Sequence, residues 1–134
     1  MHRWFCRRLS VIALGKIKAD TLEHSTSGSV DTKFVVEGSA KAWGHFEGSD
    51  ATLDDSLNCS SLTDNGTGDF NPQFSSNMVN AHFAAAADAD YNISQTSNAR
   101  AAGQATGTVR IATVDTGSFS DENDTSFSCH GELA

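Results

Sequence analysis

The strongest constraint on the fold is the pair Asn65-Gly66, which lies between two short runs of alternating residues. A two-residue hairpin turn of type I′ needs positive φ at both central residues, which Asn tolerates and Gly adopts freely. After the pair, residues 70–74 place two phenylalanines and the only proline of the chain on one face of an extended strand. The sequence therefore predicts a β-hairpin over residues 56–74 with one face turned to a core.

The same alternation continues after residue 39 and predicts an all-β domain. Residues 81–91 are rich in alanine, which suits a helix, but their period of two favours a strand. Pro72 cannot donate to a ladder, so its strand is expected at a sheet edge. The spacing of the turn signals is typical of an antiparallel β-sandwich or a jelly-roll-like domain. We expect a core of Trp43, Phe46, Phe70, Phe83 and Ile111, and strands over residues 40–47, 57–63, 69–74, 81–91, 104–115 and 125–133.

The length and the charge of the chain narrow its class. A chain of 134 residues has room for one core, here assigned to residues 39–134. Its formal net charge of -8 argues against nucleic-acid binding, and no apolar run approaches the length of about 20 residues that inserts into a membrane. Residues 1–18 hold five of the nine basic residues and no acidic residue.

Residues 1–18 combine these basic residues with large apolar ones and have three interpretations. A signal peptide is one, although the apolar part is short and no small-residue cleavage site follows it. Translation from an upstream start is another. The third is a docking arm covered by a partner, with Trp4, Phe5, Arg7, Arg8, Leu9 and Ile12 as docking residues. Residues 19–38 hold little apolar material before residues 33–36, and residues 25–29 are too small and polar to build a core alone. They predict an extended connector, or a stalk that is ordered when several copies wind together.

The sequence shows no motif for catalysis or for a cofactor. It has no GxSxG, no phosphate-binding glycine loop and no HExxH, and its five histidines lack ligand spacing. Cys6, Cys59 and Cys129 lack CxxC spacing. Cys59 and Cys129 fall within strand patterns and are expected as buried free thiols, with a disulfide between them as the alternative. We therefore expect no enzyme and no cofactor.

Acidic residues gather in the predicted loops. If the strands are antiparallel, residues 48–56, 75–80 and 116–124 all lie at the end of the domain away from residue 39. One hypothesis is a Ca²⁺ site, because hard cations take carboxylate oxygens; its candidates are Asp50, Asp54, Asp55, Asp121 and Asp124. Another is a receptor-binding surface for hydroxyl-rich ligands, made of Asp50, Asp54, Asp55, Asn77, Asp121, Glu122, Asn123 and Asp124. The alternative is that these are ordinary solvated loop acids.

Several strings resemble a family of small tailed-phage virion proteins, identified as tail fibre or structural proteins in marine and roseobacter-type phages. The resemblance covers about residues 15–134. It departs from the family at residues 70–73, Phe-Asn-Pro-Gln, and residues 1–14 lie outside it. The strings are Lys-Ile-Lys-Ala-Asp-Thr-Leu at 16–22, Gly-Ser-Val-Asp at 28–31, Ala-Lys-Ala-Trp at 40–43, Asp-Ser-Leu-Asn at 55–58, Ser-Leu-Thr-Asp-Asn-Gly-Thr-Gly-Asp-Phe at 61–70 and His-Gly-Glu-Leu-Ala at 130–134.

The resemblance implies a non-enzymatic virion appendage, most often a homotrimer, and carries over no catalytic residue. We expect a tail fibre or spike subunit in the virion, with residues 1–18 bound to other virion proteins and the β domain facing a host-surface glycan or protein. A head-decoration or connector protein, which stabilises the particle without recognising a host, is the alternative. An enzyme that cleaves surface polysaccharide is the least favoured, because no catalytic pair is present.

Overall fold

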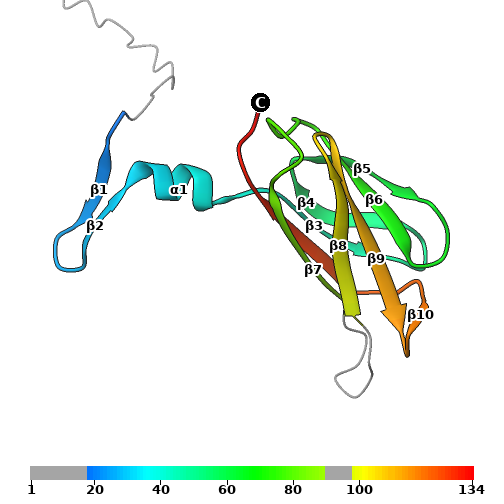
Figure 1. Ribbon diagram of the computed structural model, residues 1–134. Helices are drawn as coiled ribbons and strands as arrows, with labels where there is room; N and C mark the ends of the chain where they lie inside the picture. Colours follow the sequence, from blue (N-terminus) through cyan, green and yellow to red (C-terminus); the bar gives the residue numbers. More distant parts are fainter. Residues whose placement is uncertain (1–17, 90–97) are drawn as a thin grey trace, which may run out of the picture.

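The computed structural model describes residues 18–89 and 98–134, and within them it is almost entirely antiparallel β-structure (Figure 1). The elements are β1 (Thr21–His24), β2 (Gly28–Asp31), α1 (Thr32–Gly38), β3 (Ala40–Glu47), β4 (Thr52–Leu57), β5 (Cys59–Asp64), β6 (Asp69–Phe74), β7 (Ala84–Ala89), β8 (Asn98–Ala105), β9 (Thr108–Asp115), β10 (Ser118–Phe119) and β11 (Thr125–His130).

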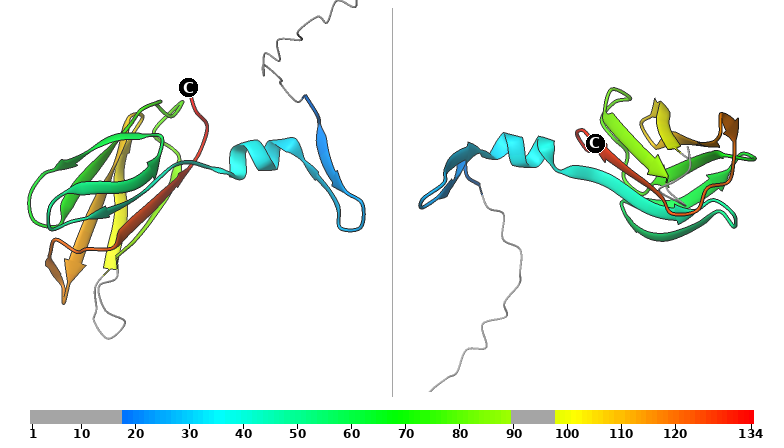
Figure 2. Two further views of the ribbon diagram at one scale, coloured as in Figure 1. Left: turned by 180° about the vertical axis from the view of Figure 1, so that it is seen from behind. Right: turned by 90° about the horizontal axis from the view of Figure 1, so that it is seen from below.

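Strands β3 to β11 form two sheets that pack face to face as a sandwich (Figure 2). The first sheet has the order β4-β3-β11-β7. In the second sheet, β9 lies between β8 on one side and β6 on the other, β5 pairs with β6, and β10 pairs with the end of β9. The prediction of an all-β antiparallel sandwich is therefore confirmed.

Aromatic rings fill the space between the sheets. The ring centroid of Phe46 lies 5.1 Å from that of Phe70 and 6.5 Å from that of Phe127. Phe74 and Phe83 form a second, edge-to-face pair at 5.9 Å. Pairs at these distances have the tilted geometry that the aromatic quadrupole favours. Four of the five expected core residues are buried, and the exception is Trp43.

Trp43 is 36% exposed and lies on the outer face of the first sheet, so its assignment to the core was wrong. Its neighbours Ala42 and Gly44 are the residues of β3 that point inward. A Cβ atom at Gly44 would lie 2.7 Å from the ring of Phe127, so that ring occupies the space that a side chain would need. The pleat of β3 then carries Trp43 outward.

Two predicted strands are each two strands in the structure. Residues 57–63 are divided at Asn58, whose φ of 58° turns the chain from the first sheet into the second. The Asn58 side chain holds this corner by accepting from Ser76 N at 2.7 Å and donating to Ser76 O at 3.0 Å. Residues 104–115 include the turn between β8 and β9 at residues 106–107. Residues 84–89 form a strand, as the period of two predicted.

The turn after β5 is longer than the predicted two-residue type. Positive φ occurs at Gly66 and Gly68 and not at Asn65. Asp64 accepts from the Gly66 N–H at 2.7 Å, and Asn65 donates to Asp69 O at 2.8 Å, which closes a four-residue loop. The hairpin itself is present, with β5 and β6 paired as expected.

Pro72 does not lie at a sheet edge, because β6 has β5 on one side and β9 on the other. The ladder to β9 is interrupted at Asn71 and Pro72, between the pairs Phe70–Ile111 and Gln73–Thr108. In this gap the Thr108 hydroxyl donates to the Pro72 carbonyl at 2.6 Å. A local break in one ladder thus accommodates the missing N–H inside the sheet.

Residues 18–39, called the arm below, project from residues 40–134, called the body (Figures 1 and 2). The connector was expected to be extended, but it contains the β1–β2 hairpin and α1. Gly28, at φ 90°, lies where the hairpin reverses, and Thr32 donates to Ala19 O at 2.6 Å. The arm joins the body at its base, where His130 Nδ1 lies 3.0 Å from Gly38 O.

Across residues 18–89 and 98–134, no helix is long and apolar enough to cross a membrane.

Candidate functional site

The loop after β3 and the loop between β10 and β11 meet at the end of the body opposite the arm. Gly48 donates its N–H to Glu122 O at 3.0 Å, and Ser49 N lies 3.3 Å from the Asn123 side-chain oxygen. Gly68 joins them by donating to Asp121 Oδ1 at 2.7 Å. Residues 48–49, 66–68 and 120–123 thus form one connected end of the sandwich, called the distal end below.

Residues 75–80 lie at the other end of the body, next to the arm, so their expected place at the distal end was wrong. Asn77 O accepts from the N–H of Ala134 at 2.9 Å, beside the C-terminus. The physical reason is the corner at Asn58, which adds one reversal of direction and exchanges the ends of the following loops. The second unexpected reversal, at residues 106–107, restores the loop after β9 to the distal end.

Three of the six carboxylates of the predicted site, those of Asp50, Asp55 and Asp121, accept hydrogen bonds from the backbone. Asp50 Oδ1 accepts from Thr52 N at 3.1 Å, and Asp55 Oδ1 accepts from Ser56 N at 2.8 Å. Glu122 is only 7% exposed. In the part of the chain that the structure describes, no three His, Cys, Asp or Glu side chains are grouped to hold a metal ion. The calcium hypothesis gains no support from this geometry.

Asp54 and Asp124 instead lie on either side of His45. His45 Nδ1 is 2.9 Å from Asp54 Oδ2, and its Nε2 is 3.5 Å from Asp124 Oδ1. The register of β3 with β4 shifts here, since His45 pairs with Asp55 and Phe46 with Leu53. Asp54 is therefore the extra residue of a β-bulge, a feature that re-aims a side chain.

The outer face of the first sheet carries two rows of side chains that sequence reasoning did not assign to a site. Residues in register across an antiparallel sheet point to the same side. The apolar row is Leu57, Trp43, Ser128 and Ala86, and the polar row is Asp55, His45, Ser126 and Asp88. A shallow hollow of about 260 Å³ lies over β7 and β11 and is lined by Ala86, Ala87, Asp88, Ser126, Phe127 and Ser128. The alternation of Trp43 with Lys41 and His45 was the available signal that it faces solvent.

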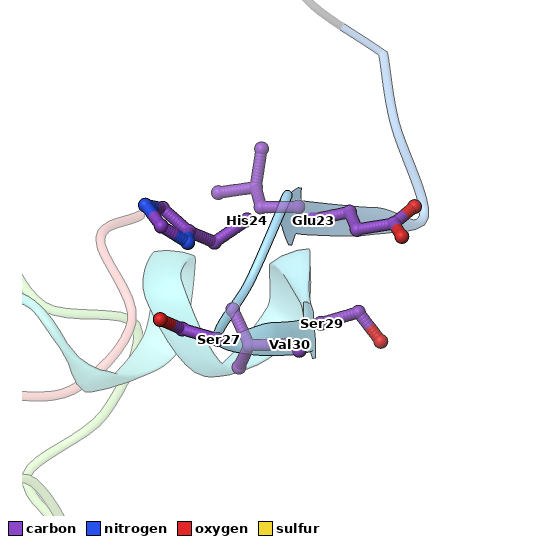
Figure 3. Close-up of a pocket in the computed structure, with 7 residues that line it drawn as sticks. Glu23, His24, Ser27, Ser29 and Val30 are labelled. Carbon is purple, nitrogen blue, oxygen red and sulfur yellow. The ribbon is translucent and has the colours of Figure 1, made fainter.

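Two hollows lie in the arm. The first has about 340 Å³ and is formed by the β1–β2 hairpin alone; Figure 3 shows Glu23, His24, Ser27, Ser29 and Val30 around it. Leu22 and Val30 pair across the two strands. The second has about 530 Å³ and lies between the hairpin and α1, lined by Lys18, Ala19, Asp20, Leu22, Thr32, Val35 and Val36. Among the described residues, side chains of the arm alone line both hollows.

The arm exposes its apolar residues. All eight residues of β1 and β2 are exposed, and α1 buries none of its side chains. Phe34 is 61% exposed and Val36 is 64% exposed. The further docking candidates Trp4, Phe5, Arg7, Arg8, Leu9 and Ile12 lie outside the described residues.

The two described thiols are free and lie within the body. Burial raises the pKa of the Cys59 thiol to about 11 and that of Cys129 to about 12. Cys59 Sγ lies 3.7 Å from Trp43 O. A thiol at these pKa values is neutral near pH 7 and is a poor nucleophile or metal ligand. The geometry thus fits structural thiols.

On the outer face of the second sheet, Arg110 forms a two-pronged ion pair with Asp69, with nitrogen–oxygen distances of 2.7 and 2.8 Å. The guanidinium hydrogen bond lowers the pKa of the Asp69 carboxyl below its usual value.

Comparison with protein-family models, with curated proteins and with solved structures found no match. The functional argument therefore rests on the chain itself.

Proposed function

We propose that this chain is a phage virion structural protein, a tail fibre or spike subunit that attaches through its arm and presents its β-sandwich outward. The observation that carries the proposal is the exposure of the arm, in which no residue of β1, β2 or α1 is buried. The resemblance of residues 15–134 to small tailed-phage virion proteins supports the same class.

Such an arm lacks the means to be stable by itself. An isolated two-stranded hairpin is marginal in water, and so is a helix as short as the seven residues of α1. Contact with other protein surfaces would bury exposed apolar side chains such as Leu22, Val30 and Phe34 and would supply the missing stabilisation. We propose that sister copies of the chain, as a homotrimer, and neighbouring virion proteins provide that surface.

The two ends of the molecule support the outward orientation. The arm enters the body at the start of β3, whereas the loops of the distal end lie at the opposite ends of the strands. Residues 1–18 hold five of the nine basic residues and no acidic residue, and the rest of the chain is strongly acidic. This polarity supports a particle-bound N-terminus and an exposed acidic body.

The test is a measurement of mass in solution combined with adsorption to host cells. The full chain is expected to have three times the monomer mass by light scattering, to adsorb to host cells and to reduce infection by competition. A strictly monomeric chain that neither adsorbs nor enters virions would overturn the proposal. Incorporation into virions without adsorption would favour the head-decoration or connector function instead.

A further inference from the structure

The outer face of the first sheet combines a flat aromatic side chain with an excess of negative charge. Trp43 stands in register with Ser128, one of the residues that line the hollow of about 260 Å³. Typical pockets for drug-sized ligands measure about 300–1,000 Å³, so this hollow has the scale of one small ring. Its floor is shallow because Ala86 and the two serines are small.

Carboxylates outnumber basic residues on this face. Among the described residues its carboxylates are Glu47, Asp54, Asp55, Asp88 and Asp124, and the residues that can carry positive charge are Lys41, His45 and His130. Lys41 is turned toward the base of the arm, where its Nζ contacts Val36 O and Ser39 O. His45 lies between Asp54 and Asp124. The hollow borders on Asp88, of which one oxygen accepts from Ala89 N at 3.1 Å.

We propose that this face binds a saccharide that bears a protonated amine, with its ring in the hollow beside Trp43. The ring of the sugar would lie against the indole, the hydroxyls would bond with Ser126 and Ser128, and the ammonium group would pair with Asp88. An aromatic face and a carboxylate both attract a cation, and charge-assisted hydrogen bonds are stronger than neutral ones. The same carboxylates disfavour anionic sugars. The proposal rests on the proposed function, because it names the ligand class of the outward-facing body.

The experiment uses the full chain with Trp4→Phe, which leaves Trp43 as the only tryptophan. Its fluorescence and calorimetry are followed while a glucosamine tetramer is added, with the fully N-acetylated tetramer and tetralysine as comparisons. We expect the glucosamine tetramer to bind and to shift Trp43 emission. We expect at least about tenfold weaker binding for the N-acetylated sugar, since each 1.4 kcal/mol corresponds to a factor of ten.

Three variants locate the site. Trp43→Ala and Asp88→Asn are each expected to weaken binding about tenfold or more. Asp20→Asn, an equal change of charge on the arm, is the matched control and should leave binding unchanged. Asp88→Asn preserves shape, so its result stands even where Trp43→Ala lowers stability.

The proposal is overturned if neither sugar binds, if the two sugars bind equally, or if tetralysine binds more tightly than the glucosamine tetramer. The mass in solution separates this failure from a failure of the proposed function. A trimer that adsorbs to host cells without binding the amino sugar refutes only the ligand. A monomer that binds the sugar refutes only the assembly.

Discussion

Replacing Phe34 by Ala tests whether the exposed surface of the arm is an interface. Phe34 is 61% exposed, which for an aromatic side chain of roughly 200 Å² leaves about 120 Å² in contact with water. Burying that area contributes about 3 kcal/mol at roughly 25 cal/mol per Å². If assembly covers the ring, Phe34→Ala weakens association by up to about 100-fold for each interface.

Phe46→Ala is the matched control, because it removes the same side chain from the core. Phe46 is fully buried and contacts the rings of Phe70 and Phe127. Truncation of a buried phenylalanine costs about 3–5 kcal/mol, a large part of the total stability of about 5–15 kcal/mol of a typical domain. We therefore expect Phe46→Ala to lower the unfolding midpoint strongly and Phe34→Ala to leave the unfolding of the body almost unchanged.

The assay measures both properties on both variants. Sedimentation or light scattering over a dilution series gives the association constant, and urea unfolding followed by circular dichroism gives the stability of the body. The reasoning would be refuted if Phe34→Ala associated like the unaltered chain and yet destabilised the body by several kcal/mol. That result would mean that Phe34 packs on its own body.

Two further predictions concern the body. Gly68→Ala should destabilise by about 2–4 kcal/mol, because φ is +66° and a Cβ would clash with the backbone oxygen of Thr113. Gly66→Ala has a strained φ of +122° but nothing within 4 Å, so it should cost less, about 1–3 kcal/mol; equal losses in urea unfolding would contradict the clash. The folded pKa values of Cys59 and Cys129 lie above the ordinary value of 9.0, so the unfolded chain releases these protons first and stability should fall as pH rises from 9.0 toward about 11–12. Thermal unfolding of Cys129→Ala should show a shallower decline over this range, and an unchanged slope would exclude the thiol as its cause.

The strands that the sequence predicted well are those with large apolar residues at every second position. Ala40–Glu47 and Asp69–Phe74 have the expected bounds, because Phe46, Phe70 and Phe74 must all face one interior. Strand β7, which is rich in alanine, was also predicted, although alanine favours a helix. The signal was the alternation of small apolar with polar residues, which fits a strand with one buried face.

The corners of the sandwich were less predictable. Asn58 has a left-handed backbone and bonds with both backbone groups of Ser76, a residue that lies eighteen positions later. Nothing in the local pattern around Asn58 reveals that partner. A short turn such as residues 106–107 likewise interrupts an alternating run without a change of composition. Each reversal that the prediction misses inverts the expected direction of all later strands. A loop is therefore placed at the correct end of the domain only when an even number of reversals before it is missed.

The body and the arm use apolar residues in opposite ways, and this contrast supports an assembled state. In the body, apolar side chains meet one another across two sheets, and Gly44 leaves room for Phe127. In the arm, Leu22, Val30 and Phe34 are exposed and meet no second layer among residues 18–89 and 98–134. A segment meant only as a spacer would need no such side chains, because polar residues would serve as well and would be more soluble. The apolar content of the arm therefore argues for a surface that covers it.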